Sequence, residues 1–205
     1  MYREMDMFDQ RKIFATDGEY FLYPIAEQDR KNYVELQRQQ NGENTLFLNP
    51  RSKDMMWQMT LEGTVLNYSI FNSKGSYCGN VEIQNPSDEH PELGISLLEE
   101  MRNQGIGPKV IKLFAAACWK NRPVEYYLVK ILSNNQHSRH IFEKLGAVII
   151  GHEGNLYSSV IEELKKVFKS EPMDETKELM KHFYDEKDEE IIYHYKLDPR
   201  MFVET

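Results

Sequence analysis

The stretch EEMRNQGIGPKVIKLF, residues 99–114, constrains the fold more than any other part of the chain. Gly105 and Gly107 stand between an apolar run at 92–98 and a helical apolar pattern that starts at Pro108. Glycine tolerates positive φ and lets a backbone approach a ligand closely, and proline in the first helical turn costs no hydrogen bond. The stretch therefore predicts a strand-to-helix turn whose unpaired amides suit an anion such as a pyrophosphate.

Two well-known phosphate loops do not fit this stretch. A P-loop requires Gly-x-x-x-x-Gly-Lys-Ser/Thr, whereas Gly105 and Gly107 are two apart and Val110 follows Lys109. A dinucleotide fingerprint requires a third glycine at 110 within a βαβ unit, and the preceding strands instead form a meander. The loop is therefore of a different kind.

Apolar periodicity predicts a mixed α/β domain. The run SKGS at 73–76 predicts a hairpin, so three antiparallel strands follow one another before the glycine turn. The strand at 124–132 carries apolar residues on both faces, which is typical of a central position. The predicted order is strand 19–25, helix 26–40, helix 50–63, strands 64–72, 77–84 and 92–98, a helix from 107, strand 124–132, helix 133–146, strand 147–151 and strand 190–198.

The sequence also predicts helix caps, core residues and the division of the chain into domains. Ser133 or Asn134 is expected to cap the helix at 133–146, with Gly146 at its exit. The apolar stripe around Trp57 in helix 50–63 reads as core more readily than as a ligand pocket, and Cys118 as a small core residue. We expect one domain over 1–205, with an N-terminal extension at 1–18 and a helical insert at 152–189 before the last strand.

Composition limits the classes of partner. The net charge of −8 weighs against nucleic acid, and no apolar run is long enough to cross a membrane. Two cysteines make no disulfide framework, so a reducing, cytoplasmic compartment is expected. His137 and His140 lack an apparent third ligand, so no metal is expected. The sequence leaves the oligomeric state open, with a homodimer as one option.

Two motifs together resemble a known family. The run Arg102-Asn-Gln-Gly105-Ile-Gly107 resembles the R/Q-x-x-G-x-G/A acyl-CoA loop of the GCN5-related N-acetyltransferase (GNAT) superfamily. The run NQHSRHIFEKLGA at 135–147 resembles the second motif, N-x-x-S-x-x-x-Y/F-x-K-x-G-F. The segment PELGIS at 91–96 is similar to the branch that acetylates ribosomal-protein N-termini and to polyamine and antibiotic acetyltransferases. The resemblance covers roughly residues 19–151 and closes with 190–198.

The resemblance implies a sheet that splays in the middle and holds acetyl-CoA as cosubstrate. Backbone amides of the loop would bind the pyrophosphate, the main chain of two strand residues would pair with pantetheine, and three helix residues would face the CoA arm and end. Arg102 alone also fits a turn residue, Asn135 a helix cap and Lys144 a solvated lysine. The implied cofactor-binding set is Leu97, Leu98, Arg102, Asn103, Gln104, Gly105, Ile106, Gly107, Asn135, Ser138 and Lys144.

Acetyl transfer to an amine requires a neutral nitrogen, a polarised thioester and a stabilised thiolate. Glu92 is the first candidate for the base and Glu82 the second, although either also fits a surface strand residue. Many family members carry a tyrosine, which protonates the thiolate, where this chain has Phe142. Tyr126, Tyr127, Ser133 or water would replace it, or the thiolate would leave unassisted.

The expected reaction is transfer of an acetyl group from acetyl-CoA to a primary amine by direct attack in a ternary complex. The alternative is a non-catalytic acyl-CoA-binding or interaction module with the same fold, which Phe142 favours. The acceptor amine belongs to a small molecule or a protein, and the sequence does not choose between them. The acidic residues in the insert favour a cationic amine if the insert covers the acceptor pocket.

Overall fold

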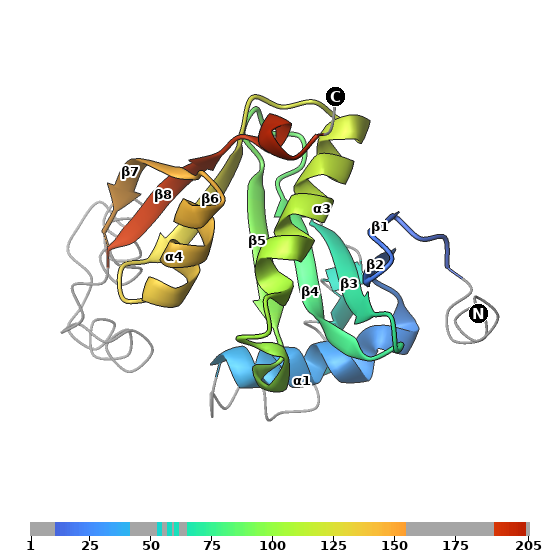
Figure 1. Ribbon diagram of the computed structural model, residues 1–205. Coiled ribbons are helices and arrows are strands. Elements are labelled where there is room, and N and C mark those ends of the chain that lie inside the picture. Colours follow the sequence, from blue (N-terminus) through green and yellow to red (C-terminus); the bar gives the residue numbers. More distant parts are fainter. Residues whose placement is uncertain are drawn as a thin grey trace, which may run out of the picture. The chain divides into compact units, whose positions relative to one another are not determined.

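The computed structural model describes residues 11–41, 53–54, 57–58, 60–61, 65–154 and 191–203 (Figure 1). The chain divides into two compact units, Met1–Val129 with Leu197–Thr205, and Lys130–Lys196. Most of the helical insert expected at 152–189, and most of the expected N-terminal extension, lie outside the described residues.

The strands form one mixed sheet, as the sequence predicts. Strands β1 to β5 pair antiparallel in sequence order, β7 pairs antiparallel with β8, and β5 and β6 are parallel at Glu92 and Leu128. The strand order is β1-β2-β3-β4-β5-β6-β8-β7. Their bounds are β1 Ala15–Thr16, β2 Tyr20–Pro24, β3 Leu66–Asn72, β4 Tyr77–Gln84, β5 Glu92–Leu97, β6 Tyr127–Leu132, β7 Val148–Glu153 and β8 Ile192–Leu197.

Helices flank the strands. The segment predicted as one helix over 26–40 begins as a 3₁₀ turn, η2 Glu27–Asp29, and continues as α1 Arg30–Asn41. The other helical elements are η4 Glu99–Met101, α3 Ile106–Asn121, α4 Gln136–Lys144 and η5 Pro199–Phe202. In the segment predicted as helix 50–63, the described residues are helical, and Trp57 is fully buried, which confirms the core interpretation for that residue.

The hairpin between β3 and β4 follows the predicted turn chemistry. The Asn72 side-chain Oδ1 accepts hydrogen bonds from the amides of Lys74 and Ser76, each at 3.0 Å. Gly75 adopts the left-handed conformation with φ of 75° that the turn requires. The hairpin fixes the register of β3 on β4, and with it the face to which each side chain points.

Consecutive residues of β3 show which helix covers which face. The Tyr68 ring packs against Phe114 of α3, with ring centroids 5.3 Å apart. The Ser69 hydroxyl donates a 2.6 Å hydrogen bond to Asp29 of η2. Because neighbouring residues of a strand point to opposite faces, α3 covers one face of the sheet, and η2 with α1 covers the other.

The α3 face is apolar, as its helical spacing predicts. Val110, Ile111, Phe114 and Ala115 are buried against it, and each large side chain removed from water contributes about 1.5–3 kcal/mol. Cys118, expected in the core, is half-buried near the C-terminal end of the helix. The short element η5 also lies against α3.

One local expectation was confirmed and one was wrong. Strand β6 has the central position expected of it, between β5 and β8. Its exposure alternates: Tyr127, Val129 and Ile131 are buried, whereas Lys130 and Leu132 are exposed. The cap of α4 is Asn135, whose side chain accepts a 3.0 Å hydrogen bond from the Ser138 amide; this confirms the alternative role given to Asn135 and excludes Ser133 and Asn134. Gly146 follows the helix with φ of 86°, as predicted.

A buried carboxylate ties the N-terminal segment to the α1 face. Asp29 is 1% exposed and accepts hydrogen bonds from the Arg11 guanidinium at 2.5 and 3.1 Å, from Ser69 at 2.6 Å and from the Ala26 amide at 3.2 Å. A buried charge persists only when its lone pairs are satisfied in this way. The contacts join η2 to β3 and to the chain that precedes β1.

Replacing Asp29 with alanine is expected to lower the free energy of unfolding by about 3 kcal/mol, because Arg11 and Ser69 lose their shared partner. Urea unfolding followed by circular dichroism measures the change. Asp88→Ala, at an exposed turn carboxylate, is the control and should change stability by less than about 0.5 kcal/mol. Equal effects of the two substitutions would contradict a structural role for Asp29.

Candidate active site

The turn between β5 and α3 has the backbone geometry of an anion site. After β5 the chain makes the 3₁₀ turn η4, and the Arg102 amide donates to the Glu99 carbonyl at 3.2 Å. Asn103 and Gly105 then adopt left-handed conformations, with φ of 59° and 75°. Gly105 is the N-cap of α3, and no side chain caps the helix.

The backbone amides of residues 103–107 donate no hydrogen bond within the part of the chain that the structure describes. Pro108 follows and has no amide hydrogen. These donors therefore lie together at the N-terminus of a 16-residue helix, where the partial positive charge of the helix also attracts an anion. The cradle predicted for residues 102–107 has its unpaired donors at 103–107.

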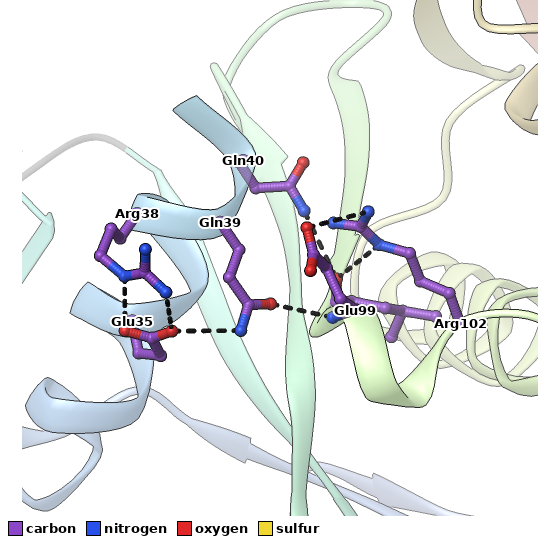
Figure 2. A network of polar contacts seen from close by, with 7 residues as sticks. Glu35, Arg38, Gln39, Gln40, Glu99 and Arg102 are labelled. Carbon is purple, nitrogen blue, oxygen red and sulfur yellow. Dashed lines mark hydrogen bonds and ion pairs between the residues drawn. The ribbon is translucent and has the colours of Figure 1, made fainter. Parts of the chain in front are cut away.

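The Arg102 side chain is partly exposed and makes polar contacts within the protein. Its Nε donates to the Leu97 carbonyl at 3.2 Å, and its Nη1 lies 4.0 Å from Glu99 Oε1 (Figure 2). Gln40 of α1 donates to the same carbonyl at 3.4 Å. Arg102 therefore holds the last residue of β5 to the start of the loop.

A second glutamine of α1 completes this network. The Gln39 Oε1 accepts a 2.8 Å hydrogen bond from the Glu99 amide, while its amide nitrogen donates to Glu35 at 3.2 Å. Figure 2 shows Gln39 and Gln40 side by side at the end of α1, both directed at the β5–η4 junction. Sequence reasoning missed both residues, since glutamines at a helix end are common on solvent-exposed surfaces.

Leu97 and Leu98 were expected to offer main-chain groups to pantetheine. The Leu98 amide donates to the Cys78 carbonyl at 3.0 Å, so this group faces β4. Main-chain groups of neighbouring strand residues point in opposite directions, and the Leu97 carbonyl accordingly faces away from β4, toward Arg102 and Gln40. Of the two residues, Leu97 is therefore the one whose main chain faces away from β4.

The two candidate carboxylates lie on the same face of neighbouring strands. In the register of β4 and β5, Glu82 is opposite Gly94, and Gln84 is opposite Glu92. Glu82 and Glu92 are therefore diagonal neighbours, at Cα positions roughly 7–8 Å apart. Both are half-buried, and Gln84 Nε2 donates to Glu82 Oε1 at 2.8 Å.

Gly94 makes room for Glu82. A Cβ on Gly94 would lie 3.2 Å from Glu82 Cγ and 3.3 Å from its Oε1, closer than ordinary packing. Glu82 pairs with Asn67, which alternates with Tyr68 along β3, so the Glu82 side chain points to the layer between the sheet and α1. In that layer, burial raises the pKa of Tyr33, the hydrogen bond from Thr60 lowers it, and the negative charge of Glu82 raises it.

Around Glu82, the α1 face of the sheet is polar and buried. Asn67 is 8% exposed, Asn80 is 3% exposed and Ser69 is fully buried. Asn67 Oδ1, Asn80 Nδ2 and the Tyr77 hydroxyl have no hydrogen-bond partner among the described residues. Buried polar atoms without partners are rare in folded proteins. Sequence reasoning missed the two asparagines, although asparagine is depleted in strands and could have been noticed.

The second motif lies in the Lys130–Lys196 unit. Asn135 Oδ1 caps α4, Ser138 is half-buried and Lys144 is exposed in the last turn. Phe142 is 3% exposed and belongs to the core of this unit. Arg139 bridges α4 to β8 by donating to the Tyr195 hydroxyl at 3.0 Å, and that hydroxyl donates to Glu143 at 2.9 Å.

The side chains considered as thiolate proton donors each have a described contact or environment. Tyr126 stacks on His90 with ring centroids 3.8 Å apart. Burial raises the pKa of Tyr127, which lies near Cys118 of α3. The Ser133 hydroxyl accepts a hydrogen bond from the Ile191 amide at 3.2 Å.

Across the described residues, no helix is long and apolar enough to span a membrane. The same part of the chain holds no group of three or more histidine, cysteine or acidic side chains arranged to bind a metal ion.

Comparison with known proteins agrees with the geometry. The profile of the acetyltransferase (GNAT) domain matches residues 18–148. No curated protein matches the chain. Among solved structures, a variant of the spermidine N-acetyltransferase from Vibrio cholerae superposes with a TM-score of 0.66 and 12% identity, covering 91% of this chain and 98% of that one.

Two further structures of that enzyme are similar. The complex with CoA and spermine gives a TM-score of 0.63 and 11% identity, over 92% of this chain and 100% of that one. A dodecameric form in an intermediate state gives a TM-score of 0.63 and 12% identity, over 91% of this chain and 98% of that one. Such low identities indicate a shared fold, whereas the profile covers most of this chain. The chain belongs to the GNAT family of acetyl-CoA-dependent N-acetyltransferases.

Proposed function

We propose that the chain transfers the acetyl group of acetyl-CoA to a primary amine by direct attack in a ternary complex. The observation that carries this proposal is the row of unpaired amides at 103–107, at the N-terminus of α3 and directly after β5. The amides would hold the pyrophosphate, and the main chain of Leu97 would meet the pantetheine arm. Asn135, Ser138 and Lys144 remain proposed contacts from the second motif.

The amine would enter on the α1 face of the sheet. There Glu82 and Glu92 offer negative charge, and Asn67 Oδ1 is a buried acceptor without a partner among the described residues. An ammonium group satisfies such acceptors, and a carboxylate can remove its proton directly or through water. A polyamine such as spermine, which the Vibrio cholerae enzyme binds, and an N-terminal peptide are both acceptors of this class.

We infer that Glu82 acts as the base and Glu92 raises the local negative charge. Glu82 lies over the side-chain-free position of Gly94 and directs its charge toward Tyr33 in the layer under α1. Glu92 stands at the start of β5, where the strand leaves its turn. The thiolate would leave without a tyrosine, because a thiol of pKa near 8–9 is a tolerable leaving group.

The alternative is acyl-CoA binding without turnover, and Phe142 is the residue that favours it. Thiol release from acetyl-CoA, followed with a chromogenic disulfide, separates the two functions. We expect release above the amine-free rate with at least one member of a panel containing spermidine, a peptide with a free N-terminus, a lysine peptide and an aminoglycoside. CoA binding without release across the whole panel would support the non-catalytic module.

Gly105→Ala is expected to weaken CoA binding by about 5- to 30-fold, because a side chain at φ of 75° costs about 1–2 kcal/mol and shifts the amides. Gly75→Ala is a matched control, since Gly75 has the same φ and open space for a Cβ in a distant turn. Arg102→Ala should weaken CoA binding less than Gly105→Ala does. Calorimetric titration with CoA measures all three, and a larger loss in Arg102→Ala would shift the anion site to that side chain.

Glu82→Gln is expected to lower kcat/KM for the amine by about a hundredfold, since the carboxylate can no longer accept a proton. CoA affinity should stay unchanged, because the substitution leaves the loop at 103–107 intact. Glu92→Gln should lower kcat/KM by less than tenfold, mainly through KM for a cationic amine. If Glu92→Gln shows the larger loss in kcat, the assignment of the base is reversed.

A further inference from the structure

The Met1–Val129 unit contains a cavity of about 410 Å³ on its α3 side. Its walls include the rings of Phe14, Tyr68 and Tyr127, and Cys118 of α3 borders it. The volume is within the range of small-molecule sites in proteins, roughly 300–1,000 Å³. None of the residues proposed to bind acetyl-CoA or to act on the amine lines this cavity.

The cavity is separated from the proposed active site in two ways. Its α3 residues, Cys118 and Asn121, lie near the C-terminal end of the helix, and a rise of 1.5 Å per residue places Cys118 roughly 16 Å from Gly107. Its β3 residues, Leu66 and Tyr68, alternate with Asn67 and Ser69 and so face away from the α1 layer.

Apolar side chains reach solvent at this cavity. Ile13 is 39% exposed and Leu66 is 45% exposed, and both line it. Large apolar side chains that gather at a hollow mark a binding surface more often than scattered ones do. Three of the polar side chains in the lining are uncharged at neutral pH, because burial raises the pKa of Cys118 to about 12 and also raises the pKa of Tyr68 and of Tyr127.

The charge of the lining is opposite to that of the whole chain. Among the described residues that line the cavity, Lys12 and Arg122 are cationic and none is an aspartate or glutamate, although the chain carries a net charge of −8. The Arg122 guanidinium donates only to main-chain carbonyls, those of Pro86, Ser87 and Asp88. Among the described residues, neither cation pairs with a carboxylate.

We propose that this cavity binds a small apolar or aromatic molecule that carries a single carboxylate, at a site separate from the acetyl-CoA and amine sites. The aromatic and aliphatic walls would bury the apolar body. The carboxylate would lie toward Lys12 and Arg122, and the tyrosine hydroxyls would supply neutral donors. An ammonium-bearing ligand is excluded by the same charges, which distinguishes this site from the acidic α1 face.

Calorimetric titration with phenylacetate, phenylacetamide and phenethylamine tests the proposal, since the three share a ring and differ in charge. We expect phenylacetate to bind with a Kd of about 1 mM or tighter, phenylacetamide more weakly and phenethylamine not at all. Saturating CoA should leave phenylacetate binding unchanged. No binding of phenylacetate, equal binding of the amine or competition with CoA would each overturn the proposal.

Two variants place the binding in the cavity. Lys12→Glu changes an exposed residue and should weaken phenylacetate about fivefold, whereas Lys74→Glu makes the same charge change in the exposed β3–β4 turn and should have no effect. Leu66→Trp fills the mouth and should abolish binding while CoA affinity is retained. Equal effects of the two lysine variants, or full binding in Leu66→Trp, would show that phenylacetate binds elsewhere.

Discussion

The alternation of side chains along β3, β4 and β5 is the constraint on which the rest of the structure depends. Once the hairpin turn at Asn72–Ser76 sets the register, every other residue is committed to one face. Alternate residues of a strand then take different roles. In β4, Val81 and Ile83 pack under α3, while Asn80 and Glu82 face α1. The apolar face supplies stability, and the buried polar face holds the groups that we propose for the amine site.

One irregularity in this register bears on the cradle. A bulge shifts the pairing between Ile70 and Phe71, and Gly79 beside it has φ of 154°. A Cβ on Gly79 would lie 2.1 Å from the Ser96 carbonyl oxygen, so only glycine lets β4 and β5 approach this closely. The close approach occurs beside Leu97, where β5 ends. The position of the loop at 103–107 therefore depends on Gly79 in the neighbouring strand as well as on Gly105 in the loop itself.

Much of this arrangement was predictable from the sequence, because local signals agree with the fold. Turn residues and apolar periodicity predict the meander, α3 and the glycine loop, and the family profile confirms the resemblance carried by the two motifs. Contacts between distant segments were not predictable. The hydrogen bond from Gln39 to Glu99 and that from Ser69 to Asp29 join residues 60 and 40 positions apart, and no local pattern encodes them. The cap of α4 was misassigned because neighbouring polar residues offer similar capping groups.

The loop also explains why a short glycine motif is a weak signal by itself and a strong one in context. Its donors are main-chain amides, which every sequence possesses, so the side chains of Asn103, Gln104 and Ile106 need not be specified by the ligand. What the proposed ligand would require is the left-handed turn at Gly105 and a helix that begins immediately after it. Arg102 contributes by fixing the strand end at Leu97. Under the proposed function, specificity for an acceptor would therefore come from side chains elsewhere, and we propose the polar α1 face, with Glu82 opposite a glycine, as the part of the first unit that provides it.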